Sequence, residues 1–398
     1  MLEGCIYAGV RTPFGRHGGA LAAVRPDEMA AQVMAAALGK TPFAPGRVEE
    51  VILGCACQSG EDSRNIARHA GLLAGLPVEV AGVTVNRLCG SGMTAAVDAA
   101  RAVTLGEADI VLAGGVESMT RAPFVMAKAP AAYARNVEVF DSTIGARFPN
   151  PRFVAGWGND TMPETADNIA FDLGIGREAS DRFAAASQER AARAQSAGLL
   201  AEEIAPVEIP ERRATRVVRE DEHPRPATTL ESLSALRPLA DGGVVTAGNA
   251  SGINDGAAAL VIGSRGAGAQ AGVAPLATIR AAAVAGVPPR VMGLGPAPAS
   301  AKALARAGLT LADMDLIEIN EAFAVQVLGA CQLMGLDPWD SRLNPNGGAI
   351  ALGHPLGATG ARLLLTAALE LNRRGGRYAL VTMCIGVGQG IAAVIERG

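Results

Sequence analysis

The run Val83-Thr-Val-Asn-Arg-Leu-Cys-Gly-Ser-Gly-Met-Thr-Ala-Ala96 passes from a strand-like segment through a cysteine and a glycine turn into a helix-like segment. A later run has the same order: it begins with Ser341-Arg-Leu-Asn344, continues through a glycine loop that contains His354 and a helix-like segment, and reaches a strand-like run at Tyr378. Strands and helices that alternate in this way indicate parallel βα units. The repeated order predicts an internal duplication with Cys89 and His354 at matching strand-to-helix junctions. Chance alternation in a chain rich in alanine and glycine is the alternative.

The length and charge of the chain limit what it can be. A chain of 398 residues is too long for one ordinary hydrophobic core, so two or three domains, or one duplicated domain, are expected. The net charge of −4 gives no general field that would attract nucleic acid or an anionic membrane, and neither is expected as a partner. No apolar run is long enough to span a bilayer, and residues 1–10 lack the pattern of a secretory signal.

The cysteines indicate a reducing compartment. Six cysteines spread over the chain are too few for a disulfide scaffold. Cys55 and Cys57 are separated by one residue, and no Cys/His pair follows at zinc-finger spacing. We therefore expect no metal and a cytoplasmic protein.

The segments along the chain predict two α/β series with a region between them. Expected strands lie at 51–54, 83–85 and 110–113, expected helices at 65–74 and 93–105, and a second series begins near 276. From about 118 to 248, proline, arginine and glutamate cluster around a helical stretch at 181–196. This composition predicts an inserted, loop-rich region that lies over the first half, as lids, binding loops and oligomer contacts do.

Cys89 is the first candidate for chemistry. A cysteine just before a helix has free backbone N–H groups and the positive end of the helix dipole beside its sulfur, which favours the thiolate. The flanking glycines allow a ligand to come close, so the pattern indicates a nucleophile. The alternative is a buried cysteine packed as a small hydrophobic side chain.

Two further residues could complete a catalytic set. His354 lies in a long glycine-rich loop before a helix, and histidine is the usual group that accepts a proton from a nucleophilic thiol. A core or capping histidine is the alternative. Cys384 ends a strand and opens the glycine turn Ile385-Gly-Val-Gly-Gln-Gly390, where a tuned thiol could act as an acid or base on carbon. Nucleophile, base and second acid/base are what acyl transfer to and from carbon needs.

Two polar loops offer hydrogen-bonding groups. Asn320 follows a strand, and its amide could orient a water or hold a developing oxyanion. Gly248-Asn-Ala-Ser-Gly-Ile-Asn254 supplies hydroxyl and backbone donors suited to an extended polar ligand. Ordinary turn and helix-cap chemistry is the alternative for both loops.

Taken together, these loops resemble the thiolase family over nearly the whole chain and in the same order. The matching motifs are Asn86-Arg-Leu-Cys-Gly-Ser-Gly92, Gly114-Gly-Val-Glu-Ser-Met119, Gly248-Asn-Ala-Ser-Gly-Ile-Asn-Asp-Gly256, Asn320-Glu-Ala-Phe323, Gly353-His-Pro-Leu-Gly357 and Cys384-Ile-Gly-Val-Gly-Gln-Gly390. The resemblance implies an α/β fold of two duplicated βαβαβαββ halves in five α-β-α-β-α layers with an inserted loop domain. It also implies a homotetramer built as a dimer of dimers. The N-terminal half would comprise residues 1–118 plus 249–271, the inserted loop domain residues 119–248, and the C-terminal half residues 272–398.

The resemblance also implies roles for individual residues. Cys89 would become acylated, and His354 would activate it and form an oxyanion hole with a water held by Asn320. Cys384 would move the proton at the α-carbon, and backbone N–H groups near Cys89 and Gly386 would form a second oxyanion hole. Coenzyme A would be a substrate and not a tightly bound cofactor. Its contacts would be Ser251, Met162, Phe323 and Ala322, with Arg225 a weaker candidate for the nucleotide end.

A narrower resemblance concerns the substrate. The segments 121–128, 162–168, 220–226 and 289–293 look like those of bacterial 3-oxoadipyl-CoA thiolases, which form succinyl-CoA and acetyl-CoA. Thr161 stands where many biosynthetic acetoacetyl-CoA thiolases carry histidine. An acetyl-CoA C-acetyltransferase and a general fatty-acid 3-ketoacyl-CoA thiolase remain alternatives. An arginine of the inserted region would meet the terminal carboxylate, and the candidates are Arg121, Arg147 and Arg152.

Two rival classes are also possible. A ketosynthase-type condensing enzyme shares the duplicated fold and the cysteine nucleophile, but it would be expected to pair the cysteine with two histidines, and here the third position is Cys384. A non-catalytic acyl-CoA or lipid-binding relative would be expected to lose the nucleophile or the base, and both are present.

Overall fold

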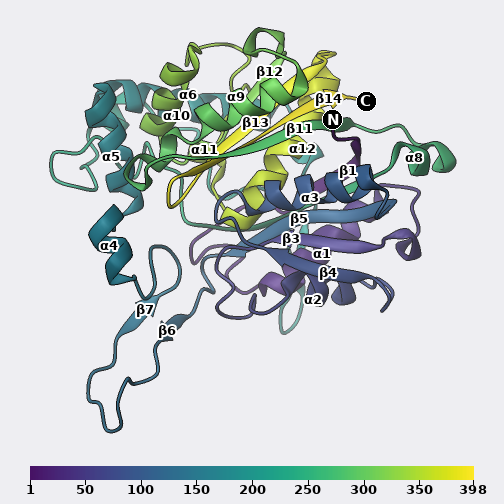
Figure 1. Cartoon of the computed structure of the whole chain (residues 1–398), viewed down its shortest axis with the longest axis horizontal. Coiled ribbons are helices and arrows are strands. Elements are labelled where there is room, and N and C mark those ends of the chain that lie inside the picture. Colours follow the sequence, from purple (N-terminus) through teal and green to yellow (C-terminus); the bar gives the residue numbers. More distant parts are fainter.

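The computed structural model describes residues 1–398 and contains two series of strands and helices that follow the same order (Figure 1). The N-terminal half comprises β1 (Gly4–Arg11), β2 (Gly15–Arg16), α1 (Pro26–Gly39), β3 (Glu50–Gly54), α2 (Ile66–Leu73), β4 (Ala81–Val85), α3 (Ser91–Leu105), β5 (Ile110–Ser118), β10 (Asn254–Gly263) and α8 (Arg265–Ala271). The C-terminal half comprises β11 (Ala277–Gly286), α9 (Pro296–Ala307), β12 (Leu316–Ile319), α10 (Ala324–Met334), α11 (Ala349–Leu352), α12 (Leu356–Arg374), β13 (Tyr378–Ile385) and β14 (Gln389–Arg397). Short 3-10 turns lie at Pro45–Arg47, Leu200–Glu202, Pro289–Leu294 and Leu311–Asp313.

Hydrogen bonds join the strands into one path, in the order β12-β13-β14-β11-β1-β10-β5-β3-β4, with β2 paired to β10. Within the N-terminal half β3 runs parallel to β4 and β5, and within the C-terminal half β12 runs parallel to β13. The strands of the two halves are hydrogen-bonded to each other only where β1 meets β11, at the pairs Gly4–Ile279, Cys5–Thr278 and Ile6–Ala277. The strands of each half therefore form a separate layer, linked at one corner.

Three hydrophobic cores confirm the predicted five layers. The central core holds residues of α3 and α12 between the two half-sheets, with Val111 of β5 and Val381 of β13 facing it. The neighbouring strand residues point the opposite way, Leu112 to the core under α1 and Leu380 to the core under α9 and α10. Figure 1 shows α3 and α12 between the blue strands of the first half and the yellow strands of the second.

The two central helices approach each other through glycine. A Cβ added at Gly92 of α3 would lie 2.4 Å from the carbonyl oxygen of Gly357 in α12, and one at Gly360 would lie 2.3 Å from the nitrogen of Met93. Only a residue without a side chain fits at these two crossings. The close approach places the first turns of both helices side by side.

The two halves differ at one edge. β4 pairs with β3 over five residues, whereas in the C-terminal half only Leu343 pairs, with Ile317. The next residue, Asn344, has a φ of 42°, and its side chain continues the ladder by accepting from the N–H of Ile319 (2.9 Å) and donating to its carbonyl (2.8 Å). The fifth strand of the second half is thus replaced by a side chain.

The inserted region is more regular than its composition predicts, and its predicted position over the first half is wrong in part. It contains β6 (Phe124–Met126), β7 (Val139–Asp141), α4 (Pro151–Trp157), α5 (Met162–Leu173), α6 (Arg177–Ser196), β8 (Val207–Pro210), β9 (Thr215–Val218) and α7 (Leu230–Ser234). Ile169 of α5 and Phe183 of α6 pack into cores that contain α10 residues of the second half. The hairpin of β8 and β9 packs on the core of the first half, through Val207 and Ile209 of β8 and Val218 of β9. The apolar faces of α5 and α6 therefore determine the placement, which proline and charge content do not predict.

No helix of the structure has both the length and the apolar character needed to cross a membrane.

Charged side chains are buried between the halves. Arg11 pairs with Glu203 (2.9 Å) and Asp221 (2.5 Å). Arg362 of α12 and Glu318 of β12 are also fully buried, but none of the three guanidinium nitrogens or the two carboxylate oxygens has a hydrogen-bond partner. Burial raises the pKa of Glu318 to about 8 although the charge of Arg362 opposes the shift. Glu318 therefore keeps a proton at neutral pH.

This pKa shift predicts a dependence of stability on pH. Between the usual carboxyl pKa and about 8, the folded protein holds a proton on Glu318 that the unfolded chain releases, so the free energy of unfolding falls as pH rises through this window. The slope from this one group is at most about 1.4 kcal/mol per pH unit. We expect Glu318→Gln, which is neutral at every pH, to reduce the slope measured by urea unfolding between pH 5 and pH 8. Glu189→Gln, at an exposed site, is the control and should leave it unchanged. Equal slopes for wild type and Glu318→Gln would contradict the assignment.

Candidate active site

Cys89 lies in a tight turn between β4 and α3. It directly precedes Gly90, the N-cap of α3, and Leu88 before it has the left-handed φ of 47°. The hydroxyl of Ser91 donates to the carbonyl of Leu88 (2.6 Å), and the side chain of Asn86 accepts from the N–H of Leu88 (2.9 Å). A left-handed conformation costs free energy for leucine, and these hydrogen bonds hold it in place. The turn places Cys89, a half-buried residue, at the start of the helix.

A second turn faces this one. Cys384 is the last residue but one of β13, and the turn beyond it contains Val387, with a left-handed φ of 63°. The backbone N–H of Gly386 lies near enough to the sulfur of Cys89 to lower its pKa, and the two thiols are close enough for the charge of one to affect the pKa of the other. Both thiols therefore lie at the turn that contains Gly386.

Thr359 fixes the tautomer of His354. His354 is buried and directly precedes Pro355, the N-cap of α12. Its Nδ1 lies 2.7 Å from the hydroxyl of Thr359, which donates its own hydrogen to the carbonyl of Pro355 (2.8 Å). The hydroxyl must then accept from Nδ1–H, so Nε2 carries the lone pair. Nε2 lies 3.4 Å from the amide nitrogen of Asn320.

The resting site is electrically neutral. Burial lowers the pKa of His354 to about 3, and the positive charge of Arg362 adds to the effect. Burial raises the pKa of Cys89 to about 11, although the backbone N–H groups of Gly386 and of Cys89 itself act in the other direction. Burial and the nearby Cys89 raise the pKa of Cys384 as well. The N–H groups lower the pKa of Cys89, as the position before a helix predicts, but burial has the larger effect and the net pKa is raised.

Asn320 has one free polar atom in the site. It is the first residue after β12, and its backbone N–H donates to the carbonyl of Thr382, two residues before Cys384. Its amide oxygen is buried without a partner. A buried amide in this state can bind a small polar group.

The predicted coenzyme A contacts also meet here, with one exception. The N–H of Ser251 donates to the carbonyl of Ala322 (2.9 Å), and Phe323 bridges to Ala250. Ala322 and Phe323 share an apolar cluster with Cys384, and Met162 packs against it. Arg225 does not join them: it is exposed, and only its backbone is held, by Gln188 of α6 (2.9 Å). A surface groove of about 860 Å³ between α6 and residues 226–230 contains none of the predicted site residues.

Two residues that support His354, Thr359 and Asn254, were not predicted from the sequence. Thr359 lies five residues after His354 in the first turns of α12, so helical spacing from the histidine could have identified it. Asn254 accepts from the backbone N–H of His354 (2.9 Å) and donates to the carbonyl of Gly15 (2.9 Å). No local pattern connects Asn254 with a histidine 100 residues away.

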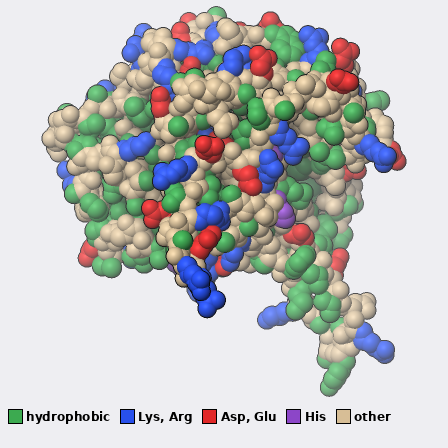
Figure 2. Space-filling view, turned by 180° about the vertical axis from the view of Figure 1, so that it is seen from behind, with side chains coloured by type: hydrophobic (Ala, Val, Ile, Leu, Met, Phe, Trp, Pro, Cys, Tyr) green, Lys and Arg blue, Asp and Glu red, His purple; other side chains and the backbone are tan.

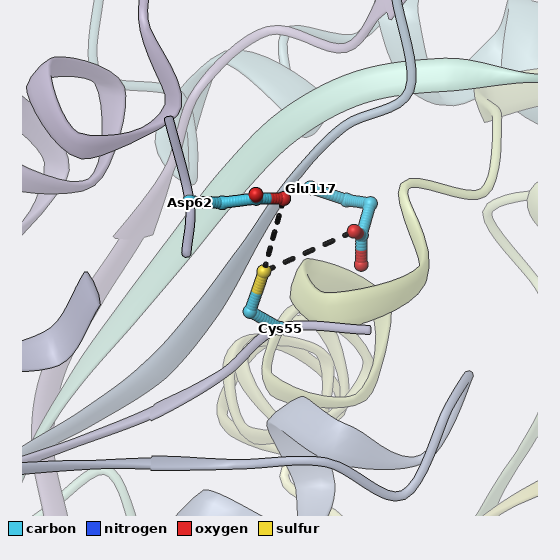
Figure 3. A group of neighbouring side chains, drawn as sticks. All are labelled: Cys55, Asp62 and Glu117. Carbon is cyan, nitrogen blue, oxygen red and sulfur yellow. Dashed lines mark hydrogen bonds between the residues drawn. The ribbon is translucent and has the colours of Figure 1, made fainter. Parts of the chain in front are cut away.

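A buried group beside the site contains metal-ligand atoms. Cys55, Asp62 and Glu117 bring a sulfur and carboxylate oxygens within 4.8 Å of one another (Figure 3). Backbone N–H groups already bind these oxygens: Glu117 accepts from Ala56, Cys57 and Gly357, and Asp62 accepts from Gln58 and Gly60. Burial raises the pKa of Glu117 to about 7, and Asp62 adds to the shift. The backbone N–H groups stabilise these carboxylates in place of a cation. The three side chains are therefore suited to joining backbone segments and not to binding a metal.

Comparison with known proteins identifies relatives that cover the whole chain. Residues 5–266 match the family "Thiolase, N-terminal domain" and residues 273–397 match "Thiolase, C-terminal domain". The chain is 57% identical over 400 residues to the "3-oxoadipyl-CoA/3-oxo-5,6-dehydrosuberyl-CoA thiolase" of Escherichia coli (strain K12), with 100% of both chains covered. It is 45% identical over 404 residues to the "Acetyl-CoA acetyltransferase" of Cupriavidus necator, again with 100% of both covered. The crystal structure of human mitochondrial 3-ketoacyl-CoA thiolase in complex with CoA superimposes with a TM-score of 0.91 at 41% identity, covering 100% of this chain and 98% of that one.

The hydrogen bond to His354 yields a prediction. Thr359→Val keeps the shape of the side chain but removes the acceptor for Nδ1–H, so the imidazole is free to take the other tautomer. An unsatisfied buried donor costs about 1–3 kcal/mol, so we expect kcat to fall roughly 5- to 150-fold. Thr359→Ser keeps the hydroxyl and should stay within a few-fold of wild type. Steady-state kinetics of both variants checks this, and equal losses in the two would show that the methyl group, not the hydroxyl, matters.

Proposed function

Because the chain belongs to the thiolase family, we propose that it cleaves 3-oxoadipyl-CoA with coenzyme A to give acetyl-CoA and succinyl-CoA, through an acyl thioester on Cys89. The chain is an acyltransferase. The arrangement of the site supports the proposed mechanism. The thiols of Cys89 and Cys384 both lie near the turn that contains Gly386, and the imidazole of His354 adjoins Asn320. The higher identity to the 3-oxoadipyl-CoA relative than to the acetyl-CoA acetyltransferase supports the substrate.

In the first half-reaction the thiol of Cys89 attacks the 3-oxo carbon while its proton passes to Nε2 of His354. The raised pKa of Cys89 requires such a transfer, and the lowered pKa of His354 keeps the imidazole ready to accept. The bond between C2 and C3 then breaks. The acetyl-CoA carbanion takes the proton of Cys384, and the shortened acyl group stays on Cys89.

In the second half-reaction coenzyme A attacks the acyl-Cys89 carbonyl. Its thiol proton passes to the Cys384 thiolate, and the leaving Cys89 sulfur regains its proton from His354, so the site returns to its resting state. Backbone N–H groups of Cys89 and Gly386 bind the oxyanion on the acyl group. The free amide oxygen of Asn320 supports its role in holding a water that, with His354, binds the thioester oxygen.

Coenzyme A acts in this scheme as a substrate that is consumed and released, with no tightly bound cofactor. Ser251, Met162, Ala322 and Phe323 form the channel for its pantetheine arm, and their contacts beside Cys384 support this. Arg225 lies at the surface, where it could reach only the nucleotide end.

The quaternary structure we propose is a homotetramer, a dimer of dimers. The hairpin of β6 and β7 extends from the body as an arm, and Figure 2 shows hydrophobic and basic side chains along it. Its apolar side chains Phe124, Met126, Tyr133, Val137 and Val139 are all more than half exposed, which supports burial against another subunit. We retain the domain boundaries 1–118 plus 249–271, 119–248 and 272–398. The six unpaired cysteines support a reducing, cytoplasmic location.

Substitution of the two thiols tests the mechanism. Cys89→Ala should lose thiolysis by at least about 10³-fold and should no longer carry a covalent acyl group after incubation with acetyl-CoA. Cys384→Ser, the matched control, should lose thiolysis but still become acetylated on Cys89, because acetylation from acetyl-CoA needs no proton transfer at carbon. Peptide mass spectrometry measures the label. Acetylation of another cysteine in Cys89→Ala would contradict the assignment.

A substrate comparison tests the rest of the proposal. We expect kcat/KM for 3-oxoadipyl-CoA to exceed that for 3-oxohexanoyl-CoA, an analogue of equal length that ends in a methyl group, by about 30- to 150-fold. Acetoacetyl-CoA and a long-chain 3-oxoacyl-CoA complete the panel. A preference for acetoacetyl-CoA would favour an acetyl-CoA C-acetyltransferase, and a preference for the long chain would favour a general fatty-acid thiolase.

A further inference from the structure

The structure separates the three arginines that could meet a terminal carboxylate. Arg121 is already paired, because its Nε (2.5 Å) and Nη2 (2.7 Å) both donate to the carboxylate of Glu61. Arg152 lies exposed on α4, and only its backbone makes a hydrogen bond, to Asn150. Arg121 therefore has an acidic partner already, and the side chain of Arg152 is not held in place by any hydrogen bond.

Arg147 differs from both. Its side chain is half-buried and donates to two backbone carbonyls, those of Ser142 (3.0 Å) and Cys57 (3.3 Å). It forms no ion pair, and the nearest acid in sequence, Asp141, is taken up by the backbone N–H (2.9 Å) and hydroxyl (2.6 Å) of Thr143. Carbonyl groups orient a guanidinium without neutralising it, so the positive charge of Arg147 remains available for an anion.

An edge-on pair of aromatic rings holds the segment that carries Arg147. Phe148 has the left-handed φ of 53°, and its ring packs edge-on against Phe140 of β7 with 4.8 Å between centroids. A side chain fixed in this way loses little freedom when a ligand binds.

Arg147 and the turn that carries Cys89 are hydrogen-bonded to neighbouring backbone carbonyls, those of Cys57 and Ala56. Arg147 donates to the carbonyl of Cys57, and Asn86 donates to that of Ala56 (3.0 Å) while its amide oxygen holds the N–H of Leu88, the residue before Cys89. The N–H groups of Ala56 and Cys57 donate to Glu117 on the other side. A short segment held from both sides therefore sets the position of Arg147 relative to Cys89.

We propose that Arg147 binds the terminal carboxylate of the acyl chain and so selects dicarboxylic 3-oxoacyl thioesters; this inference rests on the proposed function. A succinyl group on Cys89 is only four carbons long, so its carboxylate must be bound close to the nucleophile. The loop of Arg147 meets this requirement, because it is bonded to the segment 56–57 that also holds the turn of Cys89. The guanidinium has five N–H donors in a planar fork and uses only two nitrogens on the carbonyls, which leaves donors for carboxylate oxygens. A methyl-ended chain would leave these donors unpaired.

The test compares two substrates in four proteins: wild type, Arg147→Ala, Arg147→Lys, and Arg152→Ala as the control from the same inserted region. For Arg147→Ala we expect kcat/KM for 3-oxoadipyl-CoA to fall about 30- to 150-fold, while kcat/KM for 3-oxohexanoyl-CoA changes less than about threefold. Arg147→Lys keeps the charge but not the fork and should recover part of the preference. Arg152→Ala should behave as wild type. Activity on 3-oxohexanoyl-CoA reports in the same sample that each variant is folded.

The outcomes distinguish this inference from the proposed function. If wild type does not prefer 3-oxoadipyl-CoA, the proposed substrate is wrong, and the role of Arg147 is wrong with it. If wild type has the preference and Arg147→Ala keeps it, the proposed function stands and the role of Arg147 is overturned. Equal losses of both substrates in Arg147→Ala, with no recovery in Arg147→Lys, would make Arg147 a structural residue and also overturn the inference.

Discussion

The carboxylate of Glu117 connects the parts of the site to one another. It lies near the end of β5 and accepts hydrogen bonds from Ala56 and Cys57, in the loop after β3, and from Gly357, in the first turn of α12. His354 comes directly before that helix, and the turn of Cys89 is bound through Asn86 to the carbonyl of Ala56. One buried side chain, Glu117, therefore helps to position both the imidazole of His354 and the thiol of Cys89. Such a carboxylate is effective only when its backbone donors are held rigidly, and the close packing of α3 on α12 at Gly92 and Gly360 holds them.

Keeping the resting site neutral is the second requirement of this design. Two protonated thiols and a neutral imidazole can be buried without the large desolvation cost of isolated charges. Charge arises only during reaction, on atoms that already face backbone N–H groups and amides. The nearby Arg362 contributes by holding the imidazole in its neutral form.

Local sequence patterns predicted most of the fold, because strand and helix periods are local properties. The junction at Cys89 was predictable for the same reason, since it is a strand-to-helix boundary marked by glycine. The matching prediction for His354 is wrong in part: His354 does precede a helix, α12, but the short helix α11 and not a strand comes before it. Features that depend on tertiary packing were not predictable. The placement of α5 and α6 depends on which core accepts their apolar faces, and the protonation of Cys89 depends on burial that no neighbour in sequence reports. Glu117 stood in a quoted motif, but its three donors come from segments far apart in the chain. The catalytic roles of Cys89, His354 and Cys384 stay predictions.

The duplication has a consequence for how such a site can evolve. Cys89 and His354 each come directly before a helix N-cap, Cys55 and Asn320 are each the first residue after the corresponding strand, and Glu117 and Cys384 are each the last but one of theirs. Cys55 and Glu117, two of the three residues in Figure 3, therefore occupy in the first half the positions that Asn320 and Cys384 occupy in the second. Two equal halves would carry two copies of one constellation. Once both copies lie in a single chain, corresponding positions can carry different groups. The first half has the thiol of Cys89 and a carboxylate, Glu117, that binds backbone, whereas the second half has the imidazole of His354 and the thiol of Cys384. Neither half then holds the whole set of groups, so the two halves must be inherited together.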